Sequence, residues 1–304
     1  MGEKNQKSRT AIVFGGSGFL GSHVCDVLSE RGFRVKIFDR AASPYLKKGQ
    51  EMIVADILDR SKVAKAVSGC GVVYNFAGIS DLDDAVLKPL DTVHLNLVGN
   101  VHILDAAVKA RANRFVFAST IYVYSEKGGF YRCSKQSSEL YIEEYQRKYG
   151  LDFTILRYGT VYGLRADHRN SVYRYLLQAV TRGLIEYPGN GEEMRDYVNV
   201  RDAARLSVDI LGDQYKNRHI ILSGLHPIKS RNMMRIINEM LGEKIRVRFQ
   251  EKKKIRAHYE LTPYSFAPKI GYKLTDHLYV DIGQGLLECL HEIHQKLNGN
   301  QVKR

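Results

Sequence analysis

The sequence contains no tryptophan, only 6 prolines in 304 residues, and 4 cysteines that lie far apart. No two cysteines form a CxxC pair, which argues against a zinc ribbon and against a disulfide framework. Scattered cysteines suit a reducing compartment, so a cytoplasmic protein is expected. No apolar run approaches the roughly 20 residues that cross a bilayer, so no membrane partner is expected. His291 and His294 stand at helical spacing without a third ligand in view, and no metal is expected.

Positive charge is in excess, with a formal net charge of +13 at pH 7. The basic residues are spread along the chain, and the one dense run, Lys252–Lys254, is short. No DNA- or RNA-binding motif accompanies that run, so no nucleic-acid partner is expected. An anionic small substrate would use a few of these charges equally well.

Short β-rich runs alternate with helical patterns through the first half of the chain. Such an alternation predicts an α/β fold, with a parallel sheet that helices cover on both faces. The predicted strands are Thr10–Phe14, Val35–Phe38, Met52–Val54, Val72–Asn75, Arg114–Ala118 and Phe153–Leu156. The helical patterns between them include Ser61–Val67, Val93–Lys109 and Ser134–Lys148.

The alternation loosens after Gly163, where helical patterns at Ser171–Arg182, Ser230–Leu241 and Gly283–Leu297 flank irregular, basic segments. This change predicts a second, smaller domain that interleaves with the first. The first domain is expected to span residues 8–163, with 196–224 returning to it. The smaller, C-terminal substrate-binding domain is expected at 164–195 and 225–298.

Three glycines, Gly15, Gly18 and Gly21, follow the first predicted strand and open a helix. In a dinucleotide-binding loop of the Rossmann type, they permit a tight turn, the approach of a pyrophosphate and close helix packing. The next strand ends at Asp39, where a carboxylate accepts ribose hydroxyls and repels a 2′-phosphate. The pattern therefore predicts a doubly wound Rossmann-type sheet that binds NAD. Arg40, which adjoins this carboxylate, is a further candidate cofactor contact, and Asp56 after the third strand is a candidate contact to the adenine.

The stretch FASTIYVYSEKGGFYRCSK places Thr120, Tyr131 and Lys135 where a strand gives way to a helix. A phenol is a poor base at its usual pKa near 10. A lysine one helical turn away, together with the charge of the cofactor, favours the phenolate. Tyr131 is therefore predicted to exchange a proton with a substrate hydroxyl while a hydride moves to or from a nicotinamide, with Thr120 bonded to the same oxygen.

Several motifs in this order resemble the NAD-dependent epimerase/dehydratase family of the extended short-chain dehydrogenase/reductase superfamily, in particular its nucleotide-sugar epimerases. They are GGSGFLG (Gly15–Gly21), Asp39, NFAG (Asn75–Gly78), Asn96, FASTIYVY, YRCSK, LRYGTVYG (Leu156–Gly163) and GNGEEMRDYVNVRD (Gly189–Asp202). The resemblance implies a homodimer with a four-helix interface, built partly from the helix that begins near Tyr131. It also implies a role in making precursors of a surface polysaccharide.

The same resemblance assigns further contacts. It implies a set of cofactor-binding residues beyond the glycines and Asp39, namely Phe19, Leu20, Ile57, Phe76, Ala77, Gly78 and Asn96. It also implies a substrate-binding set, in which Arg195 meets the diphosphate of a nucleotide sugar, and this set is Thr120, Thr160, Asn170, Arg195 and Arg256.

The positions after Thr120 bear on the reaction. The 4,6-dehydratases of this family have Asp-Glu there, whereas this chain has Ile121 and Tyr122, which do not transfer that proton. The remaining set suffices for oxidation and re-reduction at one carbon, so an epimerase acting at C4 is predicted. The alternatives are a 4-ketoreductase or dehydrogenase with net redox turnover, and a non-catalytic NAD-binding sensor or scaffold. The short Thr120–Tyr131 loop and Ser80, where hexose epimerases often have lysine, leave the sugar open.

Overall fold

The computed structural model describes residues 9–250, 272–274 and 279–301. In this part of the chain, unit 1 consists of residues 9–158, 204–222 and 272–274, and unit 2 consists of residues 159–203, 223–250 and 279–301. The chain thus passes between the two units several times. The sequence interpretation places the first of these passages at residue 163 and the later ones at residues 195 and 224.

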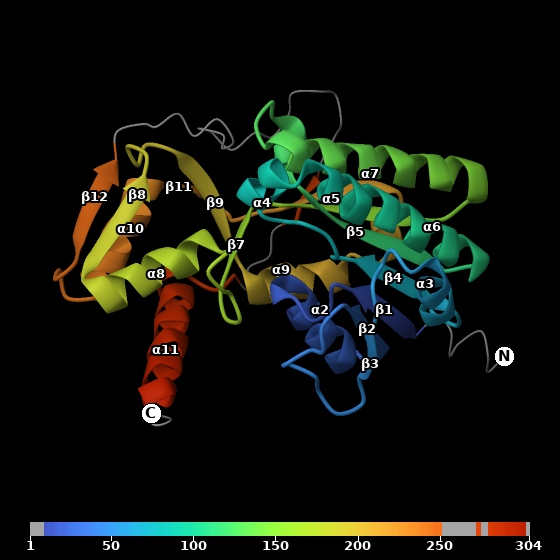
Figure 1. Cartoon of the computed structure of the whole chain (residues 1–304), viewed down its shortest axis with the longest axis horizontal. Coiled ribbons are helices and arrows are strands. Elements are labelled where there is room, and N and C mark those ends of the chain that lie inside the picture. The colour runs from blue at the N-terminus through green and yellow to red at the C-terminus, as the bar shows by residue number, and fades with distance from the viewer. Residues whose placement is uncertain (1–8, 251–271, 275–278, 302–304) are drawn as a thin grey trace. The chain divides into compact units, whose positions relative to one another are not determined.

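Unit 1 is built on a sheet of eight strands in the order β13-β10-β6-β5-β4-β1-β2-β3, and every neighbouring pair is parallel (Figure 1). The strands are β1 (Thr10–Phe14), β2 (Arg34–Asp39), β3 (Glu51–Val54), β4 (Val72–Asn75), β5 (Arg114–Thr120), β6 (Phe153–Tyr158), β10 (Arg218–Leu222) and β13 (Tyr272–Lys273). The predicted Rossmann-type α/β fold is confirmed. Strand order reverses between β1 and β4, and ligands of such sheets bind beside the strand ends at that point.

Helices cover both faces of this sheet. They are α2 (Phe19–Glu30), α3 (Arg60–Val67), α4 (Leu82–Leu87), α5 (Pro89–Val93), α6 (Gly99–Lys109), α7 (Gly129–Tyr149) and α9 (Val200–Asp209). Residues of α3, α6 and α7 share one core with the sheet. Helix α2 and the end of α9 lie together, joined by a 2.7 Å ion pair between Arg31 and Asp209.

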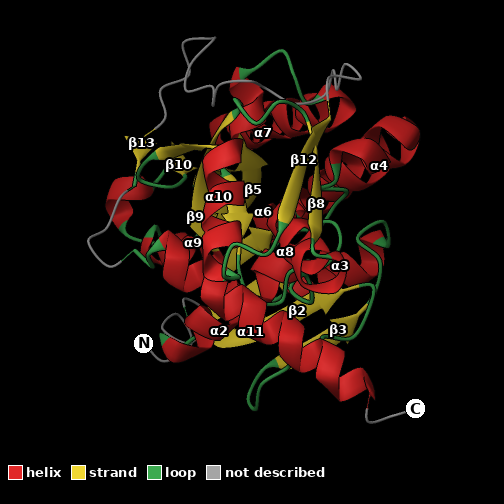
Figure 2. Cartoon of the chain, turned by 90° about the vertical axis from the view of Figure 1, so that its left-hand side faces the viewer, coloured by secondary structure: helices red, strands yellow, loops and turns green. Residues whose placement is uncertain are grey.

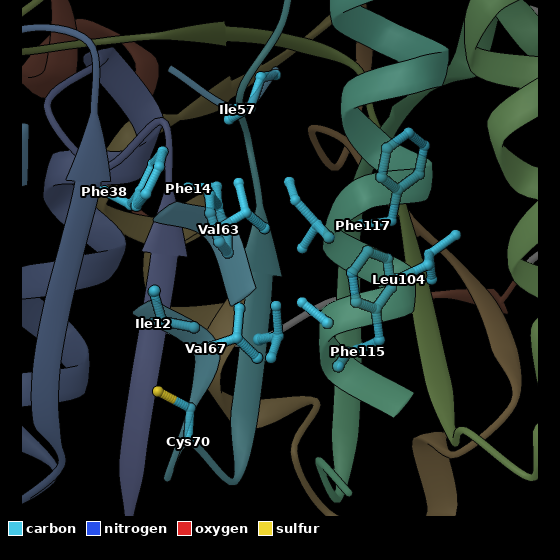
Figure 3. Packing of buried hydrophobic residues seen from close by; sticks show 14 of the residues in the cluster. Ile12, Phe14, Phe38, Ile57, Val63, Val67, Cys70, Leu104, Phe115 and Phe117 are labelled. Carbon is cyan, nitrogen blue, oxygen red and sulfur yellow. The ribbon is translucent and has the colours of Figure 1, made fainter. Parts of the chain in front are cut away.

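A cluster of buried apolar side chains lies between the sheet and α3, α6 and α7 (Figure 3). Strand β1 reads TAIVF and is buried along its whole length, as a strand covered on both faces must be. The Phe14 and Phe38 rings of neighbouring strands pack with centroids 4.7 Å apart. This core fixes the strand ends that carry the glycine loop and Thr120.

The helical stretch predicted at Val93–Lys109 is interrupted. Helix α5 runs into a π-helical turn, His94–Val98, before α6 begins at Gly99. The wider turn carries Asn96, whose side chain is only 2% exposed. Such π-turns are frequent at functional sites, because the extra residue re-aims a side chain.

Unit 2 has two small sheets, one ordered β11-β9-β7 and one pairing β8 with β12. Their strands are β7 (Thr160–Tyr162), β8 (Leu184–Pro188), β9 (Met194–Asn199), β11 (Pro227–Lys229) and β12 (Arg246–Gln250). Helices α8 (Ser171–Arg182), α10 (Ser230–Met240) and α11 (Ile282–Gln301) share a core with them. Figure 2 shows β8 and β12 as a ribbon of two strands, which are parallel.

The tyrosines Tyr141, Tyr145 and Tyr149 lie along α7, where their regular spacing suggests burial. Tyr145 packs against the core and donates a 2.6 Å hydrogen bond to Asp105. Tyr141 and Tyr149 are 47% and 50% exposed. An aromatic stripe at this spacing is expected to be buried in a core or in an interface between chains, and within the single chain Tyr145 is the member that packs on the core.

Candidate functional site

The glycine loop joins β1 to α2 in a turn that only glycine fits. Gly15 has φ +77°, and a Cβ there would lie 2.7 Å from the backbone nitrogen of Ala77. A Cβ on Gly21 would lie 2.2 Å from the Gly15 oxygen, so the helix packs directly on the turn. Gly18 caps α2 without a side-chain hydrogen bond. The first-turn amides of Phe19 and Leu20 therefore face no capping side chain, as an anion site at a helix N-terminus requires.

Asp39 ends β2 and lies beside this loop. One carboxylate oxygen accepts the Ser17 N–H at 3.1 Å, and the other accepts the Ala41 N–H at 3.4 Å. The carboxylate is half-buried, and the neighbouring Arg40 is exposed. These two hydrogen bonds from backbone N–H groups leave the carboxylate oxygens able to accept further hydrogen bonds, and ribose hydroxyls are donors of that kind. Together, the loop and Asp39 fit a dinucleotide.

The end of β3 contributes two residues in different ways. The Asp56 side chain is exposed and accepts the Leu58 N–H at 2.8 Å. Ile57 is 7% exposed and belongs to the apolar core. Of this predicted pair, only Asp56 presents its side chain at the surface.

Asn96 organises the loop that follows β4. Its carboxamide donates to the Ile79 carbonyl at 2.9 Å and accepts the Ile79 N–H at 2.7 Å. The same nitrogen contacts the Ser134 hydroxyl oxygen of α7 at 2.9 Å. A Cβ on Gly78 would lie 2.3 Å from this carboxamide. Asn96 thus holds the segment of Phe76, Ala77 and Gly78 in place, and Ser134 is a partner that the sequence did not single out.

Thr120, Tyr131 and Lys135 come together at the end of β5. Thr120 is the last residue of β5, and its side chain hydrogen-bonds the Tyr131 hydroxyl. Lys135 is 5% exposed, donates a 2.7 Å hydrogen bond to the Ala118 carbonyl, and lies with its Nζ 5.8 Å from the Tyr131 ring centroid. The structure therefore brings the three predicted residues into one cluster.

Burial dominates the ionisation of this cluster. It raises the pKa of Tyr131 to about 12, against the lowering effect of the hydrogen bond from Thr120. It also lowers the pKa of Lys135 to about 8, and the negative charge of Glu139 opposes that change. In the chain alone, the phenol is thus neutral at pH 7, and a phenolate needs positive charge beyond that of Lys135.

The two residues after Thr120 start a short 3₁₀ turn, Ile121–Tyr124. Ile121 is 1% exposed, so its side chain belongs to the core. The Tyr122 ring meets the Tyr131 ring edge-on, with centroids 6.5 Å apart. A core aliphatic and a packing aromatic thus occupy these positions.

Beneath the cluster lies a charged network that the sequence analysis did not identify. Glu139 and Arg157 form an ion pair at 2.6 Å with both side chains 0% exposed. One signal was present in the sequence, because Arg157 is a charged residue within the otherwise buried strand FTILRY. The spacing of Glu139, four residues after Lys135, was a second signal.

Thr120 lies in unit 1, and three of the other predicted substrate-binding residues belong to unit 2. Thr160 begins β7, where it is half-buried. The Asn170 carboxamide caps α8 by accepting the Tyr173 N–H and donates to the Val161 carbonyl. Arg195 lies on β9 and donates to the Met194 carbonyl at 2.9 Å. Arg256 lies outside the described residues.

The described residues contain neither a cluster of metal ligands nor a membrane-spanning helix. No group of three or more His, Cys, Asp or Glu is placed there to hold a metal ion. None of the helices in that part of the chain combines the length and hydrophobicity needed to cross a membrane.

The sequence and the fold match known proteins. The sequence model of the NAD dependent epimerase/dehydratase family matches residues 11–222. A UDP-N-acetyl-alpha-D-glucosaminuronate decarboxylase of Bacillus cytotoxicus is 28% identical over 251 residues, covering 73% of this chain and 77% of the relative. A UDP-glucose 4-epimerase of Azospirillum brasilense is 26% identical over 294 residues, 83% of each chain. The structure of a UDP-glucose 4-epimerase of Thermotoga maritima with UDP-glucose has a TM-score of 0.83 at 24% identity, covering 95% of this chain and 99% of that chain.

Proposed function

This chain belongs to the NAD dependent epimerase/dehydratase family, and we propose that it is an NAD-dependent nucleotide-sugar 4-epimerase. One observation carries the proposal. The cluster at the end of β5 has a single group suited to exchange a proton with a sugar hydroxyl, Tyr131, hydrogen-bonded to Thr120. At the two positions that follow Thr120, the chain has no carboxyl acid or base.

Three residues of the chain take part in the proton transfer, each in a different way. The chemistry that NAD supplies when bound is the reversible acceptance of a hydride. Tyr131 takes the proton from the C4 hydroxyl while the C4 hydrogen leaves as hydride, and it returns the proton when C4 is reduced again. Thr120 orients the same oxygen. The Lys135 ammonium favours the phenolate, since a nearby positive charge lowers the pKa of a phenol.

The absence of a second acid/base pair separates this proposal from a dehydratase. Elimination across C5 and C6 needs an acid and a base in addition to the tyrosine. Ile121 is buried and Tyr122 packs on the Tyr131 ring, so neither side chain fills these roles. Inversion at C4 needs only that the keto sugar turn within the pocket before it is reduced.

Further parts of the proposal concern the substrate and the assembly. The guanidinium of Arg195 would pair with the diphosphate of the nucleotide sugar, with Thr160 and Asn170 as further contacts. A homodimer would form through the helices around α7. Support for this comes from exposed apolar side chains on α4, α5 and α7, among them Leu87, Leu90, Val93, Leu140 and Tyr141, each at least 44% exposed. A cytoplasmic role in surface polysaccharide synthesis completes the proposal.

A panel of UDP-, GDP-, CDP- and dTDP-sugars, incubated with the protein and NAD but without NADH, tests the function. Chromatography that resolves the C4 epimers should show one sugar converted into its epimer. Net formation of NADH with a keto sugar as the product, or reduction of an added 4-keto sugar at the expense of NADH, would identify a dehydrogenase or 4-ketoreductase instead. NAD binding without any of these conversions would favour the non-catalytic alternative.

A further inference from the structure

A buried ion pair joins the elements that carry the reacting residues. The Arg157 guanidinium on β6 grips the Glu139 carboxylate on α7 with two bonds, Nη2 to Oε2 at 2.6 Å and Nε to Oε1 at 3.1 Å. The Ser119 hydroxyl on β5 donates to the same carboxylate at 2.5 Å. Arg157 also donates to the Tyr124 hydroxyl at the end of the 3₁₀ turn.

Three members of this network, Ser119, Glu139 and Tyr124, lie close in the sequence to a residue of the cluster. Ser119 directly precedes Thr120, and Glu139 lies one helical turn after Lys135. Tyr124 ends the turn that Thr120 begins as its cap. The network therefore ties together β5, the 3₁₀ turn and α7, which are the pieces whose relative register sets the distance between Thr120, Tyr131 and Lys135.

Stability alone does not explain such a pair. Removing two charges from water costs several kcal/mol per ion, and apolar residues of similar volume usually serve a core at least as well. Arg157 is nevertheless the largest side chain that is fully buried in the described residues. A buried network of this kind specifies one geometry, because each donor and acceptor has its partner in only one register.

We propose, on the basis of the proposed function, that Glu139 is a positioning residue of the reaction. Its carboxylate, fixed by Ser119 and Arg157, holds α7 in register against β5 and places a negative charge one turn from Lys135. The Lys135 ammonium can then stay charged although its side chain is buried, and it supports the Tyr131 phenolate.

The charges around Glu139 bear on any pH effect. Glu139 is 3.9 Å from the Nε2 of His219, which also lies 3.1 Å from a Glu143 carboxylate oxygen. The titratable and charged groups that face it from α7, β6, β10 and the 3₁₀ turn are Lys135, Glu143, Arg157, His219 and Tyr124. Of these, Lys135 is the group that the proposal places in contact with the reaction.

Glu139→Gln tests the proposal, because it keeps the shape of the side chain and removes its charge. The matched control is Glu144→Gln, which removes an exposed carboxylate from the same helix. In protein labelled with ¹³C at the lysine ε carbons, NMR titration follows the pKa of Lys135 without any substrate, and Lys135→Met assigns its signal. The pKa of Lys135 should be lower in Glu139→Gln than in the unmodified protein and should not change in Glu144→Gln.

Kinetics give a second readout. Because a misplacement of about 1 Å can cost roughly 10²-fold in rate, kcat of Glu139→Gln should fall by about that factor with little change in KM. The alkaline limb of its pH–rate profile should move to lower pH, since Lys135 loses its proton earlier. A folded Glu139→Gln protein with an unchanged Lys135 pKa and an unchanged kcat would overturn the proposal.

Two outcomes separate this proposal from the function on which it rests. If no sugar is epimerised but the Lys135 pKa falls in Glu139→Gln, the charge coupling stands and the proposed function fails. If Glu139→Gln does not fold, Ser119→Ala removes one hydrogen bond and leaves the ion pair intact. Its kcat, or its affinity for NAD if no sugar is converted, should fall about tenfold, because even a displacement below the roughly 1 Å that can cost about 10²-fold slows the reaction. Unchanged values in Ser119→Ala would refute the positioning role.

Discussion

The charge of the buried Lys135 is predicted to lower the free energy of unfolding of the protein. Its side chain is 5% exposed, and burial lowers its pKa from 10.5 to about 8. Since each pKa unit corresponds to about 1.4 kcal/mol, the charged form is penalised by roughly 3 kcal/mol at pH 7. Methionine has a similar length and no charge, but it loses the hydrogen bond to the Ala118 carbonyl, which contributes about 1 kcal/mol. Lys135→Met should therefore raise the free energy of unfolding by about 2 kcal/mol.

The stability difference between Lys135→Met and the unmodified protein should depend on pH. The folded chain releases the Lys135 proton near pH 8, whereas the unfolded chain keeps it to about pH 10.5. The penalty is thus fully present below pH 8 and fades between pH 8 and 10.5, where the unfolded state binds more protons. The stability advantage of Lys135→Met should be largest at pH 7 and should shrink across that range.

Urea denaturation of the NAD-free protein, followed by circular dichroism at pH 7 and pH 10, measures the effect. Lys148→Met is the matched control, because Lys148 is an exposed lysine on the same helix. Its free energy of unfolding should stay within about 0.5 kcal/mol of the unmodified value. A Lys135→Met protein that is less stable than the unmodified one at pH 7, with no dependence on pH, would refute the reasoning.

Two further substitutions test the ligand contacts. Calorimetry should find that the unmodified protein binds NAD more tightly than NADP, because the Asp39 carboxylate beside the glycine loop repels a 2′-phosphate. Asp39→Ala should reduce this difference in affinity. Equal affinities of the unmodified protein for NAD and NADP would contradict the assignment. Arg195→Ala should raise KM for the nucleotide sugar by about tenfold or more, since charge-assisted hydrogen bonds contribute roughly 1.5–3 kcal/mol. The control substitution is Arg174→Ala, at an exposed arginine of α8, and it should leave KM unchanged. An unchanged KM in Arg195→Ala would show that Arg195 does not bind the substrate.

The sheet of unit 1 was predictable because its strands are continuous apolar runs between helical patterns. β1 and β4 have the predicted bounds, and β5 extends two residues further, to Thr120. The glycine loop was predictable for a similar reason, since its spacing is set by backbone contacts such as that between Gly21 and the Gly15 oxygen. Local sequence determines both features.

The strands of unit 2 were harder to predict. β7 and β11 have three residues each, and β9 reads MRDYVN, in which charged and apolar residues do not alternate cleanly. Strands of this kind depend on their partners more than on their own pattern. The π-helical turn at Asn96 likewise has no signal in composition, because the helical periodicity continues on both sides of it.

The candidate site was predictable in its residues but not in its electrostatics. The spacing of Tyr131 and Lys135 indicated one helix face, and the structure places both beside Thr120. The pKa of Tyr131, raised to about 12, follows from burial by segments far apart in the sequence. The pairing of Glu139 with Arg157 joins residues 18 apart, on a helix and a strand, and only the fold brings them together.

Deuterium at C4 of the sugar gives the most direct test of the central claim, that Tyr131 moves a proton while a hydride leaves C4 and returns. A nucleotide sugar found to react is labelled with deuterium at C4 and incubated with the protein in ordinary water without NADH, and the epimer is analysed by mass spectrometry. The epimer should retain the deuterium, and its rate of formation should fall about 10²–10⁴-fold in Tyr131→Phe while NAD still binds. Loss of the deuterium to solvent, or full activity in Tyr131→Phe, would contradict the account.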